Sequence, residues 1–354
     1  MNKKIRIKDI AIRAGVSVGT VDRVLHNRPN VSESAMKKVQ AALHDMDYQP
    51  NVYASALAYN RSFSIICLMP QHESEAYWDE VEEGLMKAIS FRRDFRIGLK
   101  MIYYNRMDDV SFADACSDCM LQNPNGVILV PTSKDKSLQF ANDLHEQNIP
   151  LILLDSYIEE LNPLAFFGQD SFHSGYFAAK MLMLIASKET DIMIMKRTKK
   201  GVSATKQQEN REVGFKHYMK KHFPKVKIHE LLLPLGGDTK ACNKALTRFF
   251  ETHKQIRHGI TFNSKAWIVG EYLLQNNLTD IKIMGYDVVQ RNAACMREGS
   301  ISFLIAQHGY MQGYLAVDSM FRSIVLNQEV RCINYMPIEL LSKENIDFYQ
   351  RSTI

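Results

Sequence analysis

The sequence predicts a small all-α unit at the N-terminus followed by a larger α/β body. In the first 61 residues, apolar side chains recur at helical spacing between Gly and Asn-Pro breaks, whereas from Phe63 onward short apolar runs alternate with helical stretches. Residues 1–61 also carry ten Lys and Arg against five Asp and Glu, a net charge of +5 that equals the charge of the whole 354-residue chain. The basic excess is therefore confined to the N-terminal unit, which fits a nucleic-acid-binding domain attached to a neutral body and, on the charge alone, fits a solvated terminus equally well.

The N-terminal unit, residues 1–49, is expected to contain three helices. Apolar positions from Ile7 to Ala14 predict the first helix, which Gly15 can end in a left-handed conformation. Ser17 is suited to cap a second helix, and Ser32 to cap a third. Two short helices joined by a tight Gly turn and backed by a third form a helix-turn-helix, whose second helix would enter a DNA major groove.

Residues 50–61 are predicted to form a hinge between the two parts. Pro50 stops the preceding helix, Asn51 can cap a new one, and the helical stretch 52–58 is too short to be stable alone. Two copies that meet on DNA could order each other, although the same residues are also compatible with a plain linker.

The body, residues 62–354, contains nearly continuous apolar runs that are typical of strands in parallel sheets covered on both faces. The runs are "FSIICLMP", "FRIGLKMIYY", "NGVILVP", "PLILLD", "DIMIMK", "KIHELLLP", "HGITFN", "IKIMGYD" and "ISFLIAQ". Open sheets of this type bind ligands at the carboxyl ends of their strands, so polar residues that follow the runs are candidate ligand contacts. These are Gln71, His72, Asp155, Gln169, Asp170, Lys196, Arg197, Asn263, Asp287, Gln307 and His308.

Two further features of the body bear on a ligand. Tyr77 and Trp78 follow the first run, where a ring could stack on a sugar face or simply fill the core. The stretch "MKRTKKG", residues 195–201, is expected to be a solvated basic loop, which leaves an acidic or phosphorylated ligand possible.

Several other protein classes are disfavoured by the sequence. Neither G-x-x-x-x-G-K-[ST], G-x-G-x-x-G, G-x-S-x-G nor H-E-x-x-H is present, so we expect no catalytic residues and no cofactor. The six cysteines are scattered, and we expect Cys116 and Cys119 to be buried small residues instead of metal ligands. No apolar run approaches membrane-spanning length and no signal peptide is evident, so we expect a cytoplasmic protein with reduced thiols.

The N-terminal pattern "IKDIAIRAGVSVGTVDRVLHNR…VS…YQPN…A…LA" resembles the DNA-binding unit of the lactose-repressor (LacI/GalR) family of bacterial regulators. By position, the resemblance implies that Ser17, Thr20, Ser32 and Asn51 lie near phosphates, that Val18, Gly19 and Arg23 face bases, and that Leu57 inserts into the minor groove. Arg23 could pair with guanine, while Asp22 either accepts from cytosine or orients Arg23. Arg6, Asp22 and Ser55 replace the family's usual Thr, Ser and Arg, so we expect modest backbone affinity.

The body resembles the periplasmic-sugar-binding fold of the same family, with two Rossmann-like lobes, three crossovers and one cleft. The matching stretches are "ILLDSY", "GQDSFHSGYFAAKML", "ENREVGF", "ITFNS", "MGYD" and "FLIAQHGYMQGYLAV". The resemblance places one lobe at about 62–164 and 309–328 and the other at about 165–307 and 330–354. Ser264 departs from the family's usual acid. The candidate effector contacts are Gln71, Trp78, Asp155, Arg211, Asn263, Asp287 and Gln307.

Together these observations predict a sequence-specific DNA-binding transcriptional regulator, expected to be a repressor, whose affinity for a palindromic operator is switched by a small carbohydrate-like effector. The chain ends in "KENIDFYQRSTI" without sustained apolar heptads, so we expect a homodimer instead of a tetramer. The competing hypotheses are a sugar-kinase-like enzyme with a DNA-binding unit and a DNA-binding protein that responds to no effector.

Overall fold

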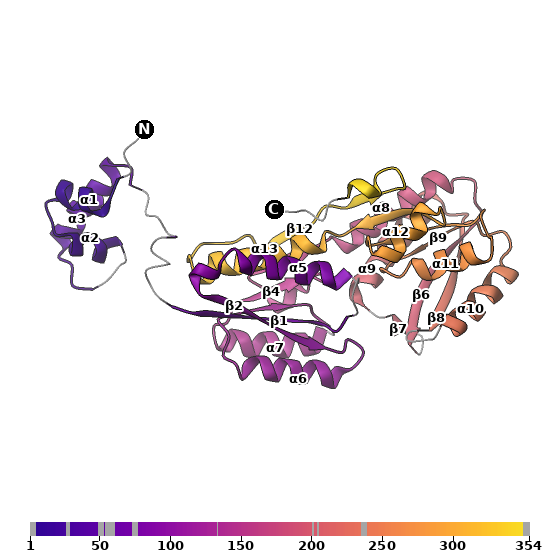
Figure 1. Cartoon of the computed structure of the whole chain (residues 1–354), viewed down its shortest axis with the longest axis horizontal. Coiled ribbons are helices and arrows are strands. Elements are labelled where there is room, and N and C mark those ends of the chain that lie inside the picture. The colour runs from indigo at the N-terminus through magenta and orange to yellow at the C-terminus, as the bar shows by residue number, and fades with distance from the viewer. Residues whose placement is uncertain are drawn as a thin grey trace. The chain divides into compact units, whose positions relative to one another are not determined.

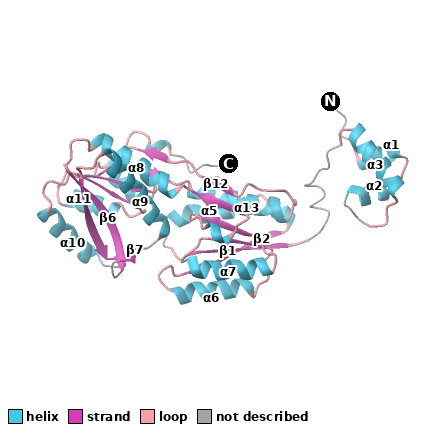
Figure 2. Ribbon diagram, turned by 180° about the vertical axis from the view of Figure 1, so that it is seen from behind, coloured by secondary structure: helices cyan, strands magenta, loops and turns pink. Residues whose placement is uncertain are grey.

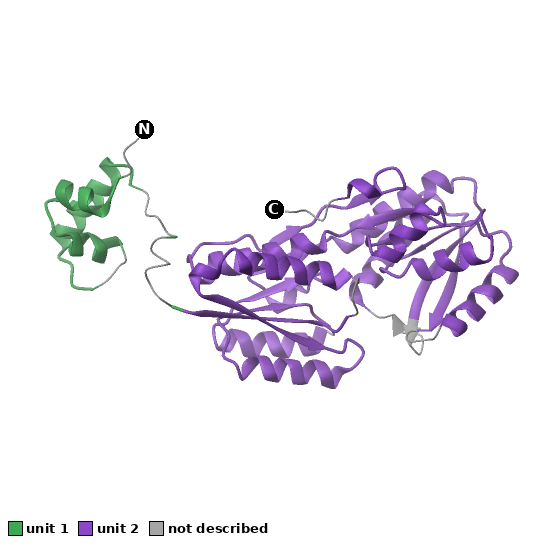
Figure 3. Cartoon of the chain, viewed as in Figure 1, with its two compact units in different colours: residues 1–61 green, residues 62–354 purple. Residues whose placement is uncertain are grey.

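The computed structural model describes residues 5–25, 29–48, 53, 61–72, 77–132, 134–199, 202–203, 205–234 and 239–349. The chain divides into two compact units, residues 1–61 and 62–354 (Figure 3). Asn51 and Leu57 lie outside the described residues, so the hinge helix and the roles of these two residues stay predictions.

In the described residues of the first unit, three helices surround a small apolar core. They are α1 (Ile7–Ala14), α2 (Val18–Leu25) and α3 (Glu33–Asp45). Ile10, Val21 and Val39, one from each helix, are fully buried against one another. Gly15 ends α1 with φ of 64°, the left-handed conformation that the sequence predicts.

The predicted caps of α2 and α3 are present. The Ser17 hydroxyl accepts a hydrogen bond from the Thr20 backbone N–H at 3.1 Å, and the Ser32 hydroxyl accepts one from the Ala35 N–H at 3.3 Å. At the start of α1, where the family Thr is replaced by Arg6, the Asp9 carboxylate accepts a hydrogen bond from the Arg6 backbone N–H at 2.9 Å. The α1 start is thus capped by the acidic side chain three residues into the helix.

The second unit contains two sheets, each built mainly from parallel strands (Figures 1 and 2). The first sheet has the order β12-β5-β4-β3-β1-β2, and the second has the order β13-β11-β10-β9-β6-β7 with β8 also paired to β6. The strands of the first sheet are β1 (Phe63–Pro70), β2 (Ile97–Tyr104), β3 (Gly126–Leu129), β4 (Leu151–Leu154), β5 (Ala165–Gly168) and β12 (Ile333–Tyr335). Those of the second are β6 (Asp191–Lys199), β7 (Val202–Ser203), β8 (Lys227–Pro234), β9 (His258–Thr261), β10 (Lys282–Tyr286), β11 (Ile301–Ala306) and β13 (Glu339–Leu341).

Helices cover both faces of each sheet, which explains the uninterrupted apolar strands. In the first lobe, α5 and α13 cover one face and α6 and α7 the other, and in the second lobe α8 and α9 lie opposite α10 and α11 (Figure 1). Their bounds are α5 (Tyr77–Ser90), α6 (Asp109–Met120), α7 (Lys134–Glu146), α8 (Ser171–Ile185), α9 (Lys206–His222), α10 (Thr239–Thr252), α11 (Trp267–Gln275), α12 (Gln290–Arg297) and α13 (Gly309–Ile324). Three short 3-10 helices span Arg93–Phe95, Glu159–Leu161 and Ile346–Phe348.

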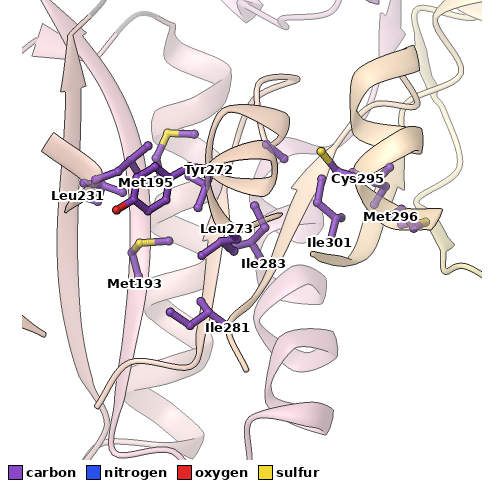
Figure 4. Packing of buried hydrophobic residues seen from close by; sticks show 14 of the residues in the cluster. Met193, Met195, Leu231, Tyr272, Leu273, Ile281, Ile283, Cys295, Met296 and Ile301 are labelled. Carbon is purple, nitrogen blue, oxygen red and sulfur yellow. The ribbon is translucent and has the colours of Figure 1, made fainter. Parts of the chain in front are cut away.

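Strand β6 shows how the two faces are separated. Ile192 and Ile194 pack among the helices α8 and α9, whereas Met193 and Met195 pack on the opposite face against residues of α11 such as Tyr272 (Figure 4). This alternation is the period of two that a strand imposes on its side chains.

All nine apolar runs form strands, but the lobe boundaries differ from the expected ones. β5 pairs with β4 in the first sheet, so this lobe extends through Gly168 instead of ending near residue 164. β12 also pairs with β5, although residues from 330 onward were assigned to the second lobe. Only β13, which pairs antiparallel with β11, lies in the second sheet. The expected boundaries were wrong because a strand of three or four residues joins a sheet by pairing with neighbouring strands. Its own sequence pattern does not determine which sheet it joins.

The basic stretch 195–201 is also not the solvated loop that was expected. β6 continues through Lys199 and pairs with β7 beyond it. Lys196 lies in this strand and forms ion pairs with Glu212 and Glu230, both at 2.7 Å. Carboxylates on neighbouring elements therefore pair with Lys196 within the sheet.

The chain passes between the lobes at three places. It leaves the first sheet after β5 to enter α8, returns after β11 through α13, and passes from β12 to β13. These crossings match the three connections that the resemblance implies, and they direct the carboxyl ends of several strands toward one cleft.

Candidate functional site

A cleft of about 600 Å³ is lined by residues from both lobes. On the first lobe, Gln71 follows β1 and Asp155 follows β4. On the second, Asn263, Asp287 and Gln307 follow β9, β10 and β11. The cleft thus lies where the carboxyl ends of parallel strands meet, the usual ligand position in open α/β sheets.

All seven candidate effector contacts line this cleft, which also includes Trp78 from α5 and Arg211 from α9. Four of them are almost inaccessible: Asp155, Arg211, Asp287 and Gln307 are exposed by only 3%, 1%, 5% and 3%. The structure brings the seven together, while their role in binding an effector stays a prediction.

A series of side-chain hydrogen bonds joins the two carboxylates of the cleft. The side-chain amide of Gln207, on α9, donates to Asp155 Oδ1 at 2.8 Å and to Gln307 Oε1 at 3.1 Å. Gln307 Nε2 donates in turn to Asp287 Oδ1 at 2.7 Å. Because Asp155 belongs to the first lobe and the other residues to the second, this series of hydrogen bonds also connects the lobes.

Arg211 supplies the buried positive charge beside this series of hydrogen bonds. Its guanidinium donates to the Phe262 carbonyl at 3.0 Å and to Gln307 Oε1, and it stacks over the Tyr286 ring with 4.0 Å between Cζ and the ring centroid. Its Nε is buried and has no hydrogen-bond partner among the described residues. A donor left unpaired in a buried position costs free energy that a ligand acceptor could recover.

Burial raises the pKa of Asp287 to about 7, and the negative charge of Asp155 acts in the same direction, against the opposing effects of Arg211 and the Gln307 hydrogen bond. Burial and the two carboxylates raise the pKa of Tyr77 well above its usual range, so its phenol stays protonated. Tyr77 lines the cleft, and its buried hydroxyl has no hydrogen-bond partner within the described ranges. It is therefore a second unused donor.

Aromatic rings form part of the cleft wall on both lobes. Trp78 lies 5.0 Å from the Arg106 guanidinium, and the Arg291 guanidinium lies 3.2 Å from the centroid of the Trp267 ring. Arg291 also holds Glu271 through paired hydrogen bonds, one of them 2.7 Å between Nε and Oε1. A guanidinium group thus lies close to each of these two tryptophan rings.

Sequence reasoning missed several cleft residues, among them Arg106, Gln207, Trp267 and Arg291. Arg106 could have been found, because it follows β2 in the same way as the collected residues follow their strands. Gln207 lies four residues before Arg211 on the same helix, and helical spacing was the available signal. Nothing local in the sequence indicates that Trp267 and Arg291 meet.

Other strand-end residues lie outside the cleft lining. Gln169 donates to the backbone carbonyls of Ala306 and Pro337 at 2.8 and 2.7 Å, which ties the strand ends of the two sheets together. Asp170 caps α8 by accepting from His173 N at 2.9 Å. Cys119 is fully buried and Cys116 packs against the same core, so both belong to the packing of α6.

The α2 surface of the first unit carries the candidate DNA contacts. Ser17, Val18, Gly19 and Arg23 are exposed, while Thr20 and Asp22 are half-buried. The Ser17 and Thr20 hydroxyls lie 2.9 Å apart, so the capping hydroxyl and its neighbour form one polar group at the start of α2. Ser32 is exposed at the start of α3. Contact with DNA by any of these residues stays a prediction.

Within the part of the chain that the structure describes, no cluster of three or more His, Cys, Asp or Glu side chains could hold a metal ion. Over the same residues, no helix has the length and apolar character needed to span a bilayer.

Family models match both units. Residues 6–51 match the bacterial regulatory proteins of the lacI family, and residues 66–327 match a periplasmic binding protein domain. A glucose-galactose binding protein, GanP from Geobacillus stearothermophilus, has the same fold, with a TM-score of 0.70 at 17% identity over 81% of this chain and 99% of that one.

Closer relatives are regulators. A solved structure from Bacteroides fragilis, described as a LacI transcriptional regulator, is 41% identical, with a TM-score of 0.79 over 82% of this chain and 100% of that one. The protein named "Probable HTH-type transcriptional repressor ExuR" from Bacillus subtilis is 28% identical over 69% of this chain and 68% of its own length. The regulator DegA of the same organism is also 28% identical, over 61% of each chain. The chain therefore belongs to the LacI family of bacterial regulatory proteins.

Proposed function

We propose that the chain is a transcriptional repressor whose operator affinity is controlled by a small polyhydroxyl effector bound in the cleft. The observation that carries this proposal is the convergence of unused donors and buried carboxylates in one cavity. Arg211 Nε and the Tyr77 hydroxyl have no hydrogen-bond partner among the described residues, and Asp155 and Asp287 lie in the same lining.

The chemistry of the lining suits a sugar or sugar derivative. Vicinal hydroxyls both donate and accept, so they can bind to carboxylate oxygens and to a guanidinium at the same time. The Trp78 and Trp267 rings at the wall offer apolar surface to the C–H face of a sugar ring. We propose that these groups bind a ligand without chemical conversion, since the family relatives named above are regulators.

Effector binding would act through the two lobes. Asp155 stands on one lobe and Arg211 and Asp287 on the other, so a ligand that contacts all three changes the free energy of a particular lobe arrangement. A nearly complete switch between operator-binding and operator-free states requires about 5 kcal/mol of differential binding. A few charge-assisted hydrogen bonds that form in only one arrangement supply a free energy of this order.

The test begins with thermal unfolding of the full chain in the presence of neutral monosaccharides, sugar acids and sugar phosphates. A ligand at a hundred times its dissociation constant adds about 2.7 kcal/mol of stability. The operator is then selected from a random duplex pool, and its affinity is measured by fluorescence anisotropy with and without the stabilising compound. Arg211→Gln should lose the ligand response, whereas Arg248→Gln, an exposed charge on α10 outside the cleft, should keep it. Operator affinity that no stabilising compound alters would exclude the proposal.

We further propose that the protein acts in the cytoplasm as a homodimer on a palindromic operator. Two recognition helices on a two-fold axis read two half-sites, which doubles the contacts of a single short helix. Light scattering of the full chain should give the mass of a dimer, and the ratio of chains to operator at saturation should be two to one. A stable tetramer, or one chain per operator, would contradict this assembly.

A further inference from the structure

A second, smaller cavity of about 230 Å³ adjoins the cleft on the second lobe. It lies between α10 and α11 near the end of β6, and it shares Lys265, Trp267 and Arg291 with the cleft. Its remaining lining is Arg197, Thr239, Cys242, Asn243, Ile268, Glu271, Tyr272 and Gln275.

The strand period places Arg197 in this cavity. Met193 and Met195 point toward α10 and α11, and Arg197 is the next residue in the same alternating series. Lys196, on the opposite face, pairs instead with Glu212 and Glu230. Arg197 therefore stands at the point where the apolar packing under α10 and α11 ends and the cavity begins.

Among the described residues that line the cavity, basic side chains outnumber acidic ones. Arg197, Lys265 and Arg291 are basic, and Glu271, which Arg291 already binds, is acidic. Arg197 Nε is buried and has no hydrogen-bond partner in the described ranges of the chain. A buried guanidinium donor of this kind favours an acceptor with negative charge, and its planar fork matches carboxylate and phosphate geometry.

We infer that this cavity is a subsite for an anionic group of the effector, so that the ligand carries a polyhydroxyl part in the cleft and a carboxylate or phosphate beside Arg197. The inference rests on the proposed function and narrows the effector to acidic sugar derivatives. Lys265 and Arg291 are the charged side chains that line both cavities, and both are at least partly exposed.

The experiment compares matched ligands on the full-length protein. Isothermal calorimetry is run with glucose, glucuronate and glucose 6-phosphate, and with galactose, galacturonate and galactose 6-phosphate. We expect at least one acidic member to bind about tenfold or more tightly than its neutral sugar, as one charged hydrogen bond allows. The better of the carboxylate and phosphate ligands identifies the anion.

Variants then assign this preference to the cavity. Arg197→Gln should reduce the ratio of acidic to neutral affinity to below about threefold, Arg197→Lys should keep most of it, and Arg248→Gln should keep all of it. Gln275→Glu adds a carboxylate at an exposed position of the cavity lining and should weaken only the acidic ligands. This second variant tests the subsite even if Arg197→Gln fails to fold.

The outcomes separate this inference from the proposed function. Equal affinity for acidic and neutral sugars in the wild type would overturn the subsite and leave the sugar-controlled repressor intact. An acidic preference that persists in folded Arg197→Gln and in Gln275→Glu would overturn it as well. If no sugar of the panel or of the thermal screen binds, both proposals fail together.

Discussion

Asp155 and Asp287 stand at the ends of β4 and β10 with backbone φ of 68° and 69°. Left-handed conformations are uncommon for residues other than Gly, and Asp is one of the few that adopt them with a small penalty. In this conformation the backbone turns sharply at the end of each of the two strands, and both aspartates line the cleft. The residue type is thus consistent with two demands at once, the backbone turn and the polar lining.

Asp287 provides a prediction about pH. An exposed aspartate has a pKa of 3.8, and burial raises the pKa of Asp287 to about 7, so between these pH values the folded state binds the proton more tightly than the unfolded chain. Stability contributed by this residue therefore falls as pH rises from about 4 to about 7, by at most about 4 kcal/mol, and is constant above that.

Asp287→Asn removes this dependence. The free energy of unfolding in urea is measured for the variant and the wild type at each pH. The value of the variant minus that of the wild type should be larger at pH 8 than at pH 4.5, because the buried charge no longer has to form in the variant. Asp280→Asn, at an exposed position nearby in the chain, is the matched control and should show a difference that stays constant. The same constant difference for Asp287→Asn would mean that the carboxylate is not held in a desolvated site.

Arg23 provides a prediction about DNA. It is exposed on α2, the helix expected to enter the major groove, and a bidentate contact to guanine contributes about 1–3 kcal/mol of discrimination. Arg23→Ala should weaken binding to the selected operator by this amount. It should also broaden the base preference at one base pair in each half-site. The measurement is anisotropy against all four bases at each position. An equal loss of affinity for every operator sequence would instead indicate that Arg23 contacts a phosphate.

Residues that follow strands were predictable from the strand pattern, whereas residues on helices were predicted in part: Arg211 on α9 through the family resemblance and Trp78 through its place after the first run. Asp155, Asn263, Asp287 and Gln307 could be collected from the sequence because parallel strands end at one edge. Trp267 and Arg291 meet through the packing of α11 against α12, which no local pattern encodes. Arg197, the central residue of the proposed anionic subsite, was collected as a residue that follows a strand, but "MKRTKKG" was expected to be a loop because its pairing with β8 and β9 is not encoded locally.

At the scale of elements, α5 and α13 are the most closely packed helices of the first lobe. A Cβ added to Gly84 would overlap the backbone carbonyl of Tyr310, and one added to Gly313 would overlap that of Val81. Backbone atoms cannot move aside as a flexible side chain does. The two glycines therefore set the distance between the helices.

Gly84→Ala should consequently destabilise the body by about 1–3 kcal/mol or more through overpacking. Gly98→Ala is the matched control, because its nearest neighbour would be Phe63 O at 4.0 Å, an ordinary contact. Urea unfolding of the two variants beside the wild type measures the difference. Equal stability of both variants would show that α5 and α13 can separate at little cost.

The elements themselves were predicted unequally. Long apolar strands such as β1 and β8 coincide with their sequence runs to the residue, and the caps of α2 and α3 follow from Ser17 and Ser32. β5, β12 and β13 contain only three or four residues each and were not predicted. Such strands are stabilised by pairing to a preformed sheet edge, so their existence depends on contacts distant in sequence.

At the scale of the whole molecule, the two compact units differ in net charge and in whether they contain the cleft. Residues 1–61 carry the entire net charge of +5, and the described residues that line the cleft belong to the second unit. Affinity for DNA depends on cations that displace counterions from phosphates, whereas affinity for the effector depends on the cleft. Separating the units should therefore separate the two activities.

A chain comprising residues 62–354 should fold, bind the effector within about twofold of the full chain, and lose measurable operator affinity. The twofold limit follows because none of the cleft lining is removed, while the loss of DNA binding follows because the remaining residues have no net charge and lack α2. Calorimetry with the identified effector and anisotropy with the selected operator give the two affinities, and circular dichroism gives the fold. The full chain serves as the control, and its operator affinity should fall steeply with salt, as counterion release requires. Operator binding that survives in residues 62–354 would show that the body carries the DNA contact, and a large loss of effector affinity would show that the first unit takes part in forming the cleft.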